Sequence, residues 1–328
     1  MPEILLWHWV AFVAFVAVLL ALDLLVFHRR DHAPSLAESA GWTIFWFALA
    51  LAFNGFIWWW LGHKPALEFA TGFLVELSLS MDNVFVFVVI FRFFAIPLKY
   101  QYRVLFWGIL GAIIMRLLFV VVGNELIRRF EWISPLFGLF LVWTAFKLAT
   151  QTESDVHPEK NILMRLARRF FKVSKDDHHQ HGHAFFVREA GQLCFTPMFL
   201  VLLVIESTDV LFAVDSVPAI FGITKNVFII YTSNIFAILG LRAKYFLLAG
   251  MVELFEYLHY GLSAILGFIG VNMVADWWFK PELLPEGEQF HVIPIWGKLV
   301  TIAVLLGVSI VVSVVVKKRG QRATDRRL

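Results

Sequence analysis

Acidic residues at a repeated spacing inside apolar segments are the chemically most informative feature of this sequence. The stretch ELSLSMDNV at 76–84 and the stretch DVLFAVDSV at 209–217 each place two carboxylates six residues apart. The oxygen-bearing side chains that these stretches and their flanks supply are Glu76, Asp82, Asn83, Glu206, Asp209, Asp215 and Ser216. Carboxylate, amide and hydroxyl oxygens are the ligands that Mg²⁺, Ca²⁺ and Mn²⁺ prefer. The pattern therefore predicts a site for a hard divalent cation, without choosing among the three.

The same acids carry a large energetic cost if they lie in the hydrocarbon interior of a membrane. At 1.5 Å per residue, Glu76 lies roughly 15 Å into its apolar segment, near the middle of a bilayer core about 30 Å thick. Five ionised acids there would cost on the order of 12–18 kcal/mol unless they were paired, protonated or bound to a cation. Arg116 and Arg242 are the arginines in the matching segments. Two arginines cannot neutralise five acids, so the sequence predicts surplus negative charge for cations or protons.

Helical geometry groups some of these side chains and separates others. Glu76 and Asn83 are seven residues apart and share a helix face, whereas Glu76 and Asp82 do not. The second copy contains Pro218, which cannot donate a hydrogen bond to the carbonyl oxygen of Val214. We expect the helix to be interrupted there, which would leave that carbonyl as a further ligand.

Other polar residues give weaker indications. Asn234 is either an extra oxygen ligand or a contact between helices. We expect Asp23, near one end of the first apolar segment, to be solvated at the membrane interface. The histidines between His178 and His183 either capture metal at the cytoplasmic side or belong to a solvated loop.

Composition identifies the class of protein. Of the 328 residues, 60% are hydrophobic and 16% are charged, against about 45–50% and 25% in soluble domains. Cys194 is the single cysteine, so no dithiol or intramolecular disulfide can form. The apolar segments contain no zinc-protease histidine pair, nucleophile elbow or paired haem histidines. We therefore expect a membrane protein that is not an enzyme, has no tightly bound cofactor and does not bind nucleic acid.

The apolar segments predict an all-α, polytopic bundle of about nine transmembrane helices embedded in a lipid bilayer. A transmembrane helix needs about 20 mostly apolar residues, and nine segments qualify: 4–27, 41–61, 66–94, 103–127, 132–149, 196–221, 227–250, 257–278 and 292–316. Most Lys and Arg residues fall on the cytoplasmic side if the N-terminus is outside and the C-terminus is cytoplasmic. The tryptophans at 58–60 and 277–278 then form belts at the outer interface.

The two acidic stretches belong to a longer internal duplication. Arg116 matches Arg242, and three apolar segments follow the same order in each half. Because three is odd, the second copy enters the membrane from the opposite side, which gives a 3+3 inverted-topology repeat. The predicted organisation is two N-terminal helices at 1–62, repeat 1 at 63–149, a cytoplasmic His-rich basic loop at 150–195, repeat 2 at 196–278, and a final loop, helix and basic tail at 279–328.

The sequence resembles the TerC family, and most closely its Alx branch. The likeness rests on the motifs at 76–85, 206–220 and 232–250, and it extends over nearly the whole chain. The resemblance implies a bacterial inner-membrane protein related to the LysE transporter superfamily. It also implies that the ion path includes Glu76, Asp82, Asn83, Glu206, Asp209 and Asp215. The histidines at 178–183 match no family motif.

Two functions follow from the resemblance and the residues together. The first is export of a divalent metal ion, Mn²⁺ foremost with Ca²⁺ and Mg²⁺ as alternatives, by alternating access through the buried carboxylates. The second is a membrane partner that supplies metal to exported proteins at the secretion machinery, in the metal-homeostasis and tellurite-resistance role associated with the family. The family's older label of redox modulator fits poorly with a single cysteine.

Overall fold

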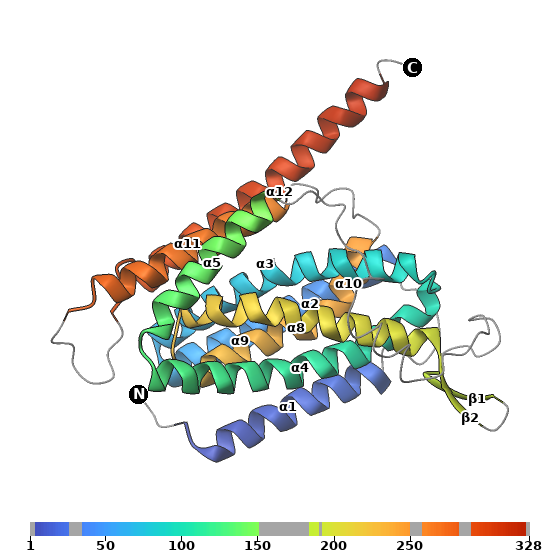
Figure 1. Ribbon diagram of the computed structural model, residues 1–328, viewed down its shortest axis with the longest axis horizontal. Coiled ribbons are helices and arrows are strands. Elements are labelled where there is room, and N and C mark those ends of the chain that lie inside the picture. Colours follow the sequence, from blue (N-terminus) through green and yellow to red (C-terminus); the bar gives the residue numbers. More distant parts are fainter. Residues whose placement is uncertain are drawn as a thin grey trace.

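The computed structural model describes residues 4–25, 35–150, 184–189, 192–249, 258–281 and 290–325. In these ranges the chain forms a bundle of α-helices with one small hairpin (Figure 1). The helices are α1 Leu6–Leu25, α2 Leu36–Leu61, α3 His63–Phe93, α4 Leu98–Arg129, α5 Ile133–Thr150, α8 Pro197–Phe221, α9 Val227–Leu239, α10 Leu241–Ala249, α11 Leu258–Trp278 and α12 Ile295–Asp325. Strands β1 Phe186–Glu189 and β2 Gln192–Phe195 pair in antiparallel fashion. The histidines from His178 to His183 lie outside the described residues.

The helix lengths confirm the predicted all-α membrane bundle. In the described ranges, eight helices are long and apolar enough to cross a membrane, and the pair α9 and α10, bent by 40°, brings the number to nine. Figure 1 shows that α3, α4 and α8 run along the same direction, as expected for helices that cross a membrane together. The membrane class follows from these spans.

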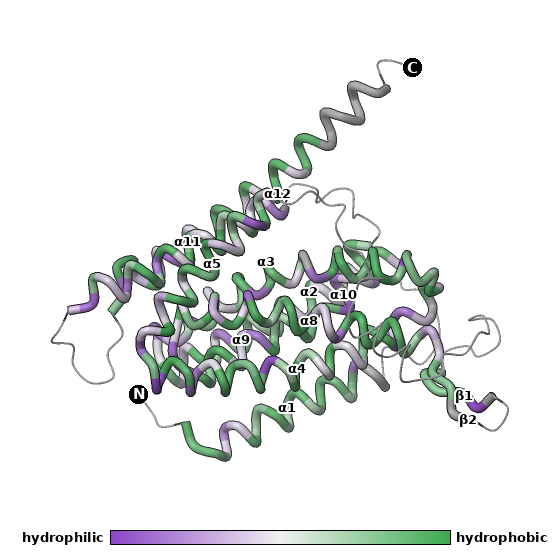
Figure 2. Tube along the Cα trace, in the orientation of Figure 1, coloured by the Kyte–Doolittle hydropathy of each residue, from purple (hydrophilic) through white to green (hydrophobic). Residues whose placement is uncertain are grey.

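The outer surface of the bundle is apolar. Trp59 is 82% exposed, Trp278 72% and Phe146 70%. Figure 2 shows hydrophobic residues along most of the helices, including those at the periphery. Side chains this large and apolar are stable in contact with lipid tails rather than water.

The helices form two packed groups. Helices α3, α4, α8 and α9 pack against one another, and α1, α2 and α10 cover them on one side. Helices α5, α11 and α12 form a second group that is inclined to the first (Figure 1). Every residue of α9 from Phe228 to Leu239 is buried, which makes α9 the innermost helix.

The packing agrees with the predicted duplication without establishing it. In the predicted duplication, α3 corresponds to α8 and α4 corresponds to α9. A contact between α3 and α9 should then be matched by a contact between α8 and α4. Both contacts are present. Helices α5 and α11, the third members of the two copies, pack together. The inverted repeat and the domain boundaries drawn from it remain predictions.

The predicted interruption at Pro218 is wrong. Helix α8 continues through Pro218 to Phe221, and the amide of Gly222 donates to the carbonyl oxygen of Pro218 over 3.2 Å. The proline lies in the last turn, where losing one intrahelical hydrogen bond does not end the helix. The bend occurs instead at Gly240, between α9 and α10, where a side-chain Cβ would lie 3.1 Å from Cβ of Trp46.

Two glycines allow α5 and α11 to cross at very short range. A Cβ added at Gly270 would lie 2.6 Å from the carbonyl oxygen of Gly138, and one added at Gly138 would lie 2.8 Å from the carbonyl oxygen of Gly270. Small residues at such crossings let helix backbones approach closely inside membranes. The crossing holds α5, which contributes to the site described below, against α11.

Gly270→Ala should therefore destabilise the bundle by about 1–3 kcal/mol, because the added methyl group overpacks a backbone contact that cannot move aside. Gly307→Ala, in α12, is the matched control, since a Cβ there meets nothing within 4 Å. Thermal unfolding of the purified variants in detergent measures the difference. Equal midpoints for the two variants would contradict the close crossing of α5 and α11.

Candidate cation site

A cavity of about 210 Å³ lies among α3, α4, α5, α8 and α11. Four of the sequence-predicted residues line it, namely Asn83, Arg116, Asp215 and Ser216. Thr144 and Lys147, both from α5, complete its polar lining and were not expected from the sequence. The structure therefore brings parts of both acidic stretches to one partly open space between the helices.

Asp215 is the described carboxylate on the wall of this cavity. Thr144 Oγ1 donates a hydrogen bond to Asp215 Oδ1 over 3.1 Å, and Lys147 interacts with the carboxylate electrostatically. The neighbouring Ser216 Oγ is buried and has no hydrogen-bond partner among the described residues. Carboxylate, hydroxyl and amide oxygens thus face one space, and this donor set fits a hard divalent cation.

Arg116 links the cavity to a buried charge cluster. Its guanidinium forms an ion pair with Glu76 across α4 and α3, and its Nη1 donates to Asn234 Oδ1 of α9 over 2.6 Å. Asn234 in turn donates from Nδ2 to the carbonyl oxygen of Ile230 over 2.8 Å. Because the amide oxygen and the amide nitrogen of Asn234 both form hydrogen bonds within the protein, Asn234 acts here as a contact between helices.

Asp209 lies beside this cluster and is almost completely buried. Its side chain interacts electrostatically with Arg116 and Glu76, and its Oδ2 has no hydrogen-bond partner among the described residues. A second cavity of about 10 Å³ adjoins it, a space of about the size that holds one water molecule. A buried carboxylate oxygen without a partner is costly unless a proton, a water molecule or a cation occupies the site.

Glu206 and Val214 lie away from the larger cavity. Glu206 packs against Gly111 of α4, close enough that a Cβ on that glycine would overlap its carboxylate. Val214 is 40% exposed and does not line the cavity. The side chain of Asp82 lies outside what the structure describes. These residues therefore remain predicted parts of the ion path.

Arg242 does not neutralise the clustered acids, contrary to the sequence-based expectation. It forms a buried ion pair with Asp23 of α1. Asp23 is only 7% exposed, so the expectation that it is solvated at the interface is also wrong. A different basic residue, Lys244, is buried and interacts electrostatically with Glu76 at longer range, without forming an ion pair among the described residues.

A preformed metal centre is not present in the described part of the chain. Among those residues, no three His, Cys, Asp or Glu side chains converge in a way that could hold a metal ion. Lys147 also lowers the negative potential around Asp215, and Arg116 adds a second positive charge to the lining of the cavity. A cation held in the larger cavity would therefore rely on Asp215 together with neutral oxygens.

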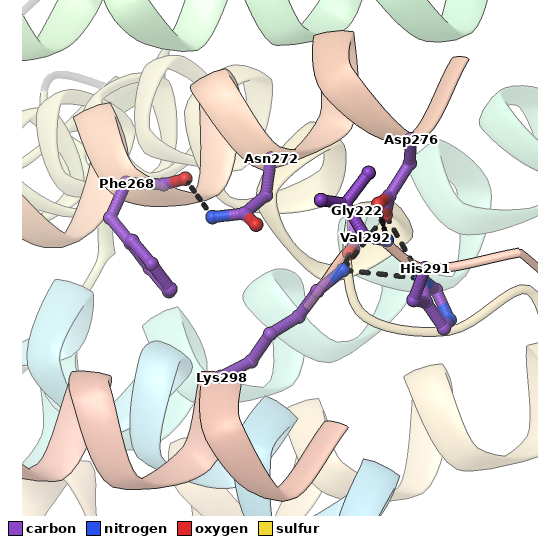
Figure 3. Close-up of polar contacts among 7 residues, drawn as sticks. All are labelled: Gly222, Phe268, Asn272, Asp276, His291, Val292 and Lys298. Carbon is purple, nitrogen blue, oxygen red and sulfur yellow. Dashed lines mark hydrogen bonds and ion pairs between the residues drawn. The ribbon is translucent and has the colours of Figure 1, made fainter. Parts of the chain in front are cut away.

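A second polar cluster joins α8, α11, α12 and the segment before α12 (Figure 3). Lys298 Nζ lies 2.9 Å from Asp276 Oδ2, 3.1 Å from the carbonyl oxygen of Gly222 and 3.2 Å from His291 Nδ1. Asp276 Oδ1 accepts from the amide of Val292 over 2.6 Å. Sequence reasoning missed this cluster, although Lys298 and Asp276 are ionisable residues within apolar segments, the feature that identified the other acids.

Comparison with known proteins agrees with this architecture. The model of the family described as "Integral membrane protein TerC family" matches residues 61–321. A membrane protein of Myxococcus xanthus is 47% identical over 97% of this chain and 94% of its own length. Several relatives are named Alx, a proposed membrane-bound redox modulator. The one from Escherichia coli K12 is 43% identical over 87% of this chain and 91% of its own length, and the one from Photorhabdus laumondii is 41% identical over 97% of each.

No solved structure matches the chain. The relation to the LysE transporter superfamily stays an expectation drawn from the resemblance. The family match covers both acidic stretches and most of the transmembrane bundle, including the helices that enclose the cavity. The chain is a member of the TerC family of integral membrane proteins.

Proposed function

We propose that this protein exports Mn²⁺ across a bacterial inner membrane by alternating access. The observation that carries the proposal is the partly open cavity that Asp215, Asn83 and Ser216 line together. Its donors are oxygens, which Mn²⁺, Mg²⁺ and Ca²⁺ prefer over the sulfur and nitrogen donors favoured by softer ions. The cavity lies between membrane-spanning helices, where an ionisable side chain marks an ion or substrate path by default.

The arrangement of charges suggests how binding and release would alternate. In this structure the positively charged Arg116 and Lys147 line the same cavity as Asp215, so the cavity attracts a divalent ion only weakly. Arg116 is held by Glu76 and Asn234, each from a different helix. A relative movement of α3, α4 and α9 would shift the guanidinium and change the affinity of the cavity. Such coupling between helix position and ion affinity is what alternating access requires.

The names of the Alx relatives refer to redox modulation, and the residues of this chain favour ion transport over dithiol chemistry. Cys194 is the single cysteine and it is buried. A reversible intramolecular disulfide needs two thiols. The buried carboxylates and arginines, by contrast, have no use in thiol exchange.

Purified protein in liposomes tests the proposal. We expect Mn²⁺ to cross the membrane of vesicles that contain the chain, at a rate well above that of protein-free vesicles, and Mg²⁺ or Ca²⁺ in excess to compete. The change in fluorescence of a metal-sensitive dye trapped inside the vesicles measures the entry of Mn²⁺ directly. Because no other protein is present, flux also separates transport from metal supply to exported proteins. Identical Mn²⁺ entry with and without the protein would refute transport.

A further inference from the structure

Lys244 is a buried cation to which the described residues offer no carboxylate within ion-pair distance. Its side chain is 6% exposed, and it lies one turn after the bend at Gly240. Its Nζ donates to the carbonyl oxygen of Ala237 over 2.7 Å and to Oγ of Ser80 over 3.2 Å. Glu76 interacts with it only at longer range. Among the described residues, two neutral oxygens therefore hold this amino group in the interior of the bundle.

The bend between α9 and α10 explains why the carbonyl oxygen of Ala237 is free to accept a hydrogen bond from Lys244. Ala237 is one of the last four residues of α9, whose carbonyl groups lack donors in their own helix. The C-terminal end of a helix also carries a partial negative charge. The hydroxyl of Ser80 donates its proton to the carbonyl oxygen of Leu77 over 2.9 Å, so its lone pairs face the ammonium group. The helix end and the serine thus form a small oxygen site for a cation.

Sites of this kind have a general role in membrane transport. In secondary transporters, the carbonyl oxygens and C-terminal ends of broken membrane helices coordinate coupling cations. Backbone carbonyl oxygens alone can coordinate a singly charged ion such as K⁺, whereas sites for divalent ions usually include at least one carboxylate. The α9–α10 break has the broken helix and the neutral oxygens, and the ammonium group of Lys244 stands where the ion would be.

We propose that the break between α9 and α10 is a monovalent-cation site that Lys244 fills with a tethered ammonium group. The ammonium replaces an alkali ion, so the native chain needs neither Na⁺ nor K⁺ at this point. The site is separate from the cavity at Asp215, which Lys244 does not line. Removing the ammonium while leaving its space should make the site accessible to alkali ions from solution.

Thermal unfolding of purified variants tests this without relying on transport. Lys244→Ala leaves space for an ion, Lys244→Met fills the space without a charge, and Lys244→Arg keeps the charge. We expect the alanine variant to unfold at a lower temperature than the native chain in choline chloride. In NaCl or KCl of equal ionic strength it should regain about 3 °C or more. The native chain and the methionine and arginine variants should melt equally in all three salts.

Equal midpoints of the alanine variant in choline, Na⁺ and K⁺ would overturn the proposal. Lys244→Gln provides a second test if the alanine variant cannot be purified. The glutamine amide can donate hydrogen bonds, but it carries no charge. We expect it to be less stable than Lys244→Arg in choline. If glutamine matches arginine, hydrogen bonding alone explains the residue and the proposal fails.

Transport adds a readout that rests on the proposed function. In liposomes, Mn²⁺ flux through the native chain should not change when choline replaces Na⁺ and K⁺, whereas flux through Lys244→Ala should depend on them. Absence of flux in the native chain would refute Mn²⁺ transport alone, since the salt-dependent unfolding of Lys244→Ala would still report the cation site. Native flux that requires Na⁺ or K⁺ would refute the role assigned to Lys244.

Discussion

Asp215→Asn is expected to weaken the apparent affinity for Mn²⁺ in transport by about 10–100-fold, the equivalent of losing one charge-assisted contact. Asp215 is the described carboxylate on the cavity wall, and Asn83, Ser216 and Thr144 offer only neutral oxygens. Asparagine keeps the shape of the side chain and can still accept from Thr144. The loss should therefore appear in flux as a function of Mn²⁺ concentration, with little change in the unfolding temperature.

Two further variants show whether the charge in the cavity is the cause. Glu125→Gln removes a carboxylate from an exposed pair with Arg129, where surface ion pairs contribute little, and it should transport like the native chain. Thr144→Val removes the hydrogen bond to Asp215 but leaves the carboxylate, so its effect should be smaller than that of Asp215→Asn. If Asp215→Asn kept the Mn²⁺ affinity of the native chain, the cavity would not be part of the ion path.

Hydropathy was sufficient to predict the membrane spans. Each of the nine apolar segments became a helix or, for 227–250, a bent pair of helices. The reason is that a lipid-exposed backbone must satisfy its own hydrogen bonds, which leaves a helix as the available structure for an apolar segment of this length. The bend itself was placed wrongly, because Pro218 lies too near the end of α8 to break it.

The site could be predicted only in part. The cost of burying charge identified Asp215 and Arg116, and the spacing of the repeats added Asn83 and Ser216, all of which meet at one cavity. Which cation pairs with which acid depends on packing between helices that are distant in sequence. Arg242 therefore pairs with Asp23 of α1 rather than with the clustered acids. Thr144 and Lys147, near the end of an apolar segment, have no sequence signal that separates them from ordinary interfacial residues.

The pair of Arg116 and Glu76 raises a different question, which is whether Glu76 serves the fold or the ion. Both side chains are 1% exposed, and Glu76 faces Arg116 at the centre of the bundle. Removing one partner of a buried ion pair leaves an uncompensated charge and costs about 3–5 kcal/mol. Arg116→Leu should accordingly be one of the most destabilising substitutions in the chain. Glu76→Gln should cost less, because Arg116 keeps Asn234 and the nearby carboxylate of Asp209.

The double variant Arg116→Leu with Glu76→Gln separates the two roles. We expect it to be more stable than Arg116→Leu alone, with a coupling of about 0.5–3 kcal/mol, because it leaves no unpaired charge at position 76. Unfolding midpoints of the two single variants and the double variant measure the coupling. Additive losses would contradict a direct ion pair. Mn²⁺ flux in Glu76→Gln, which is the more stable single variant, then decides the role of the acid. Native flux would make Glu76 a structural counter-ion of Arg116, whereas reduced flux in a folded variant would place Glu76 on the ion path.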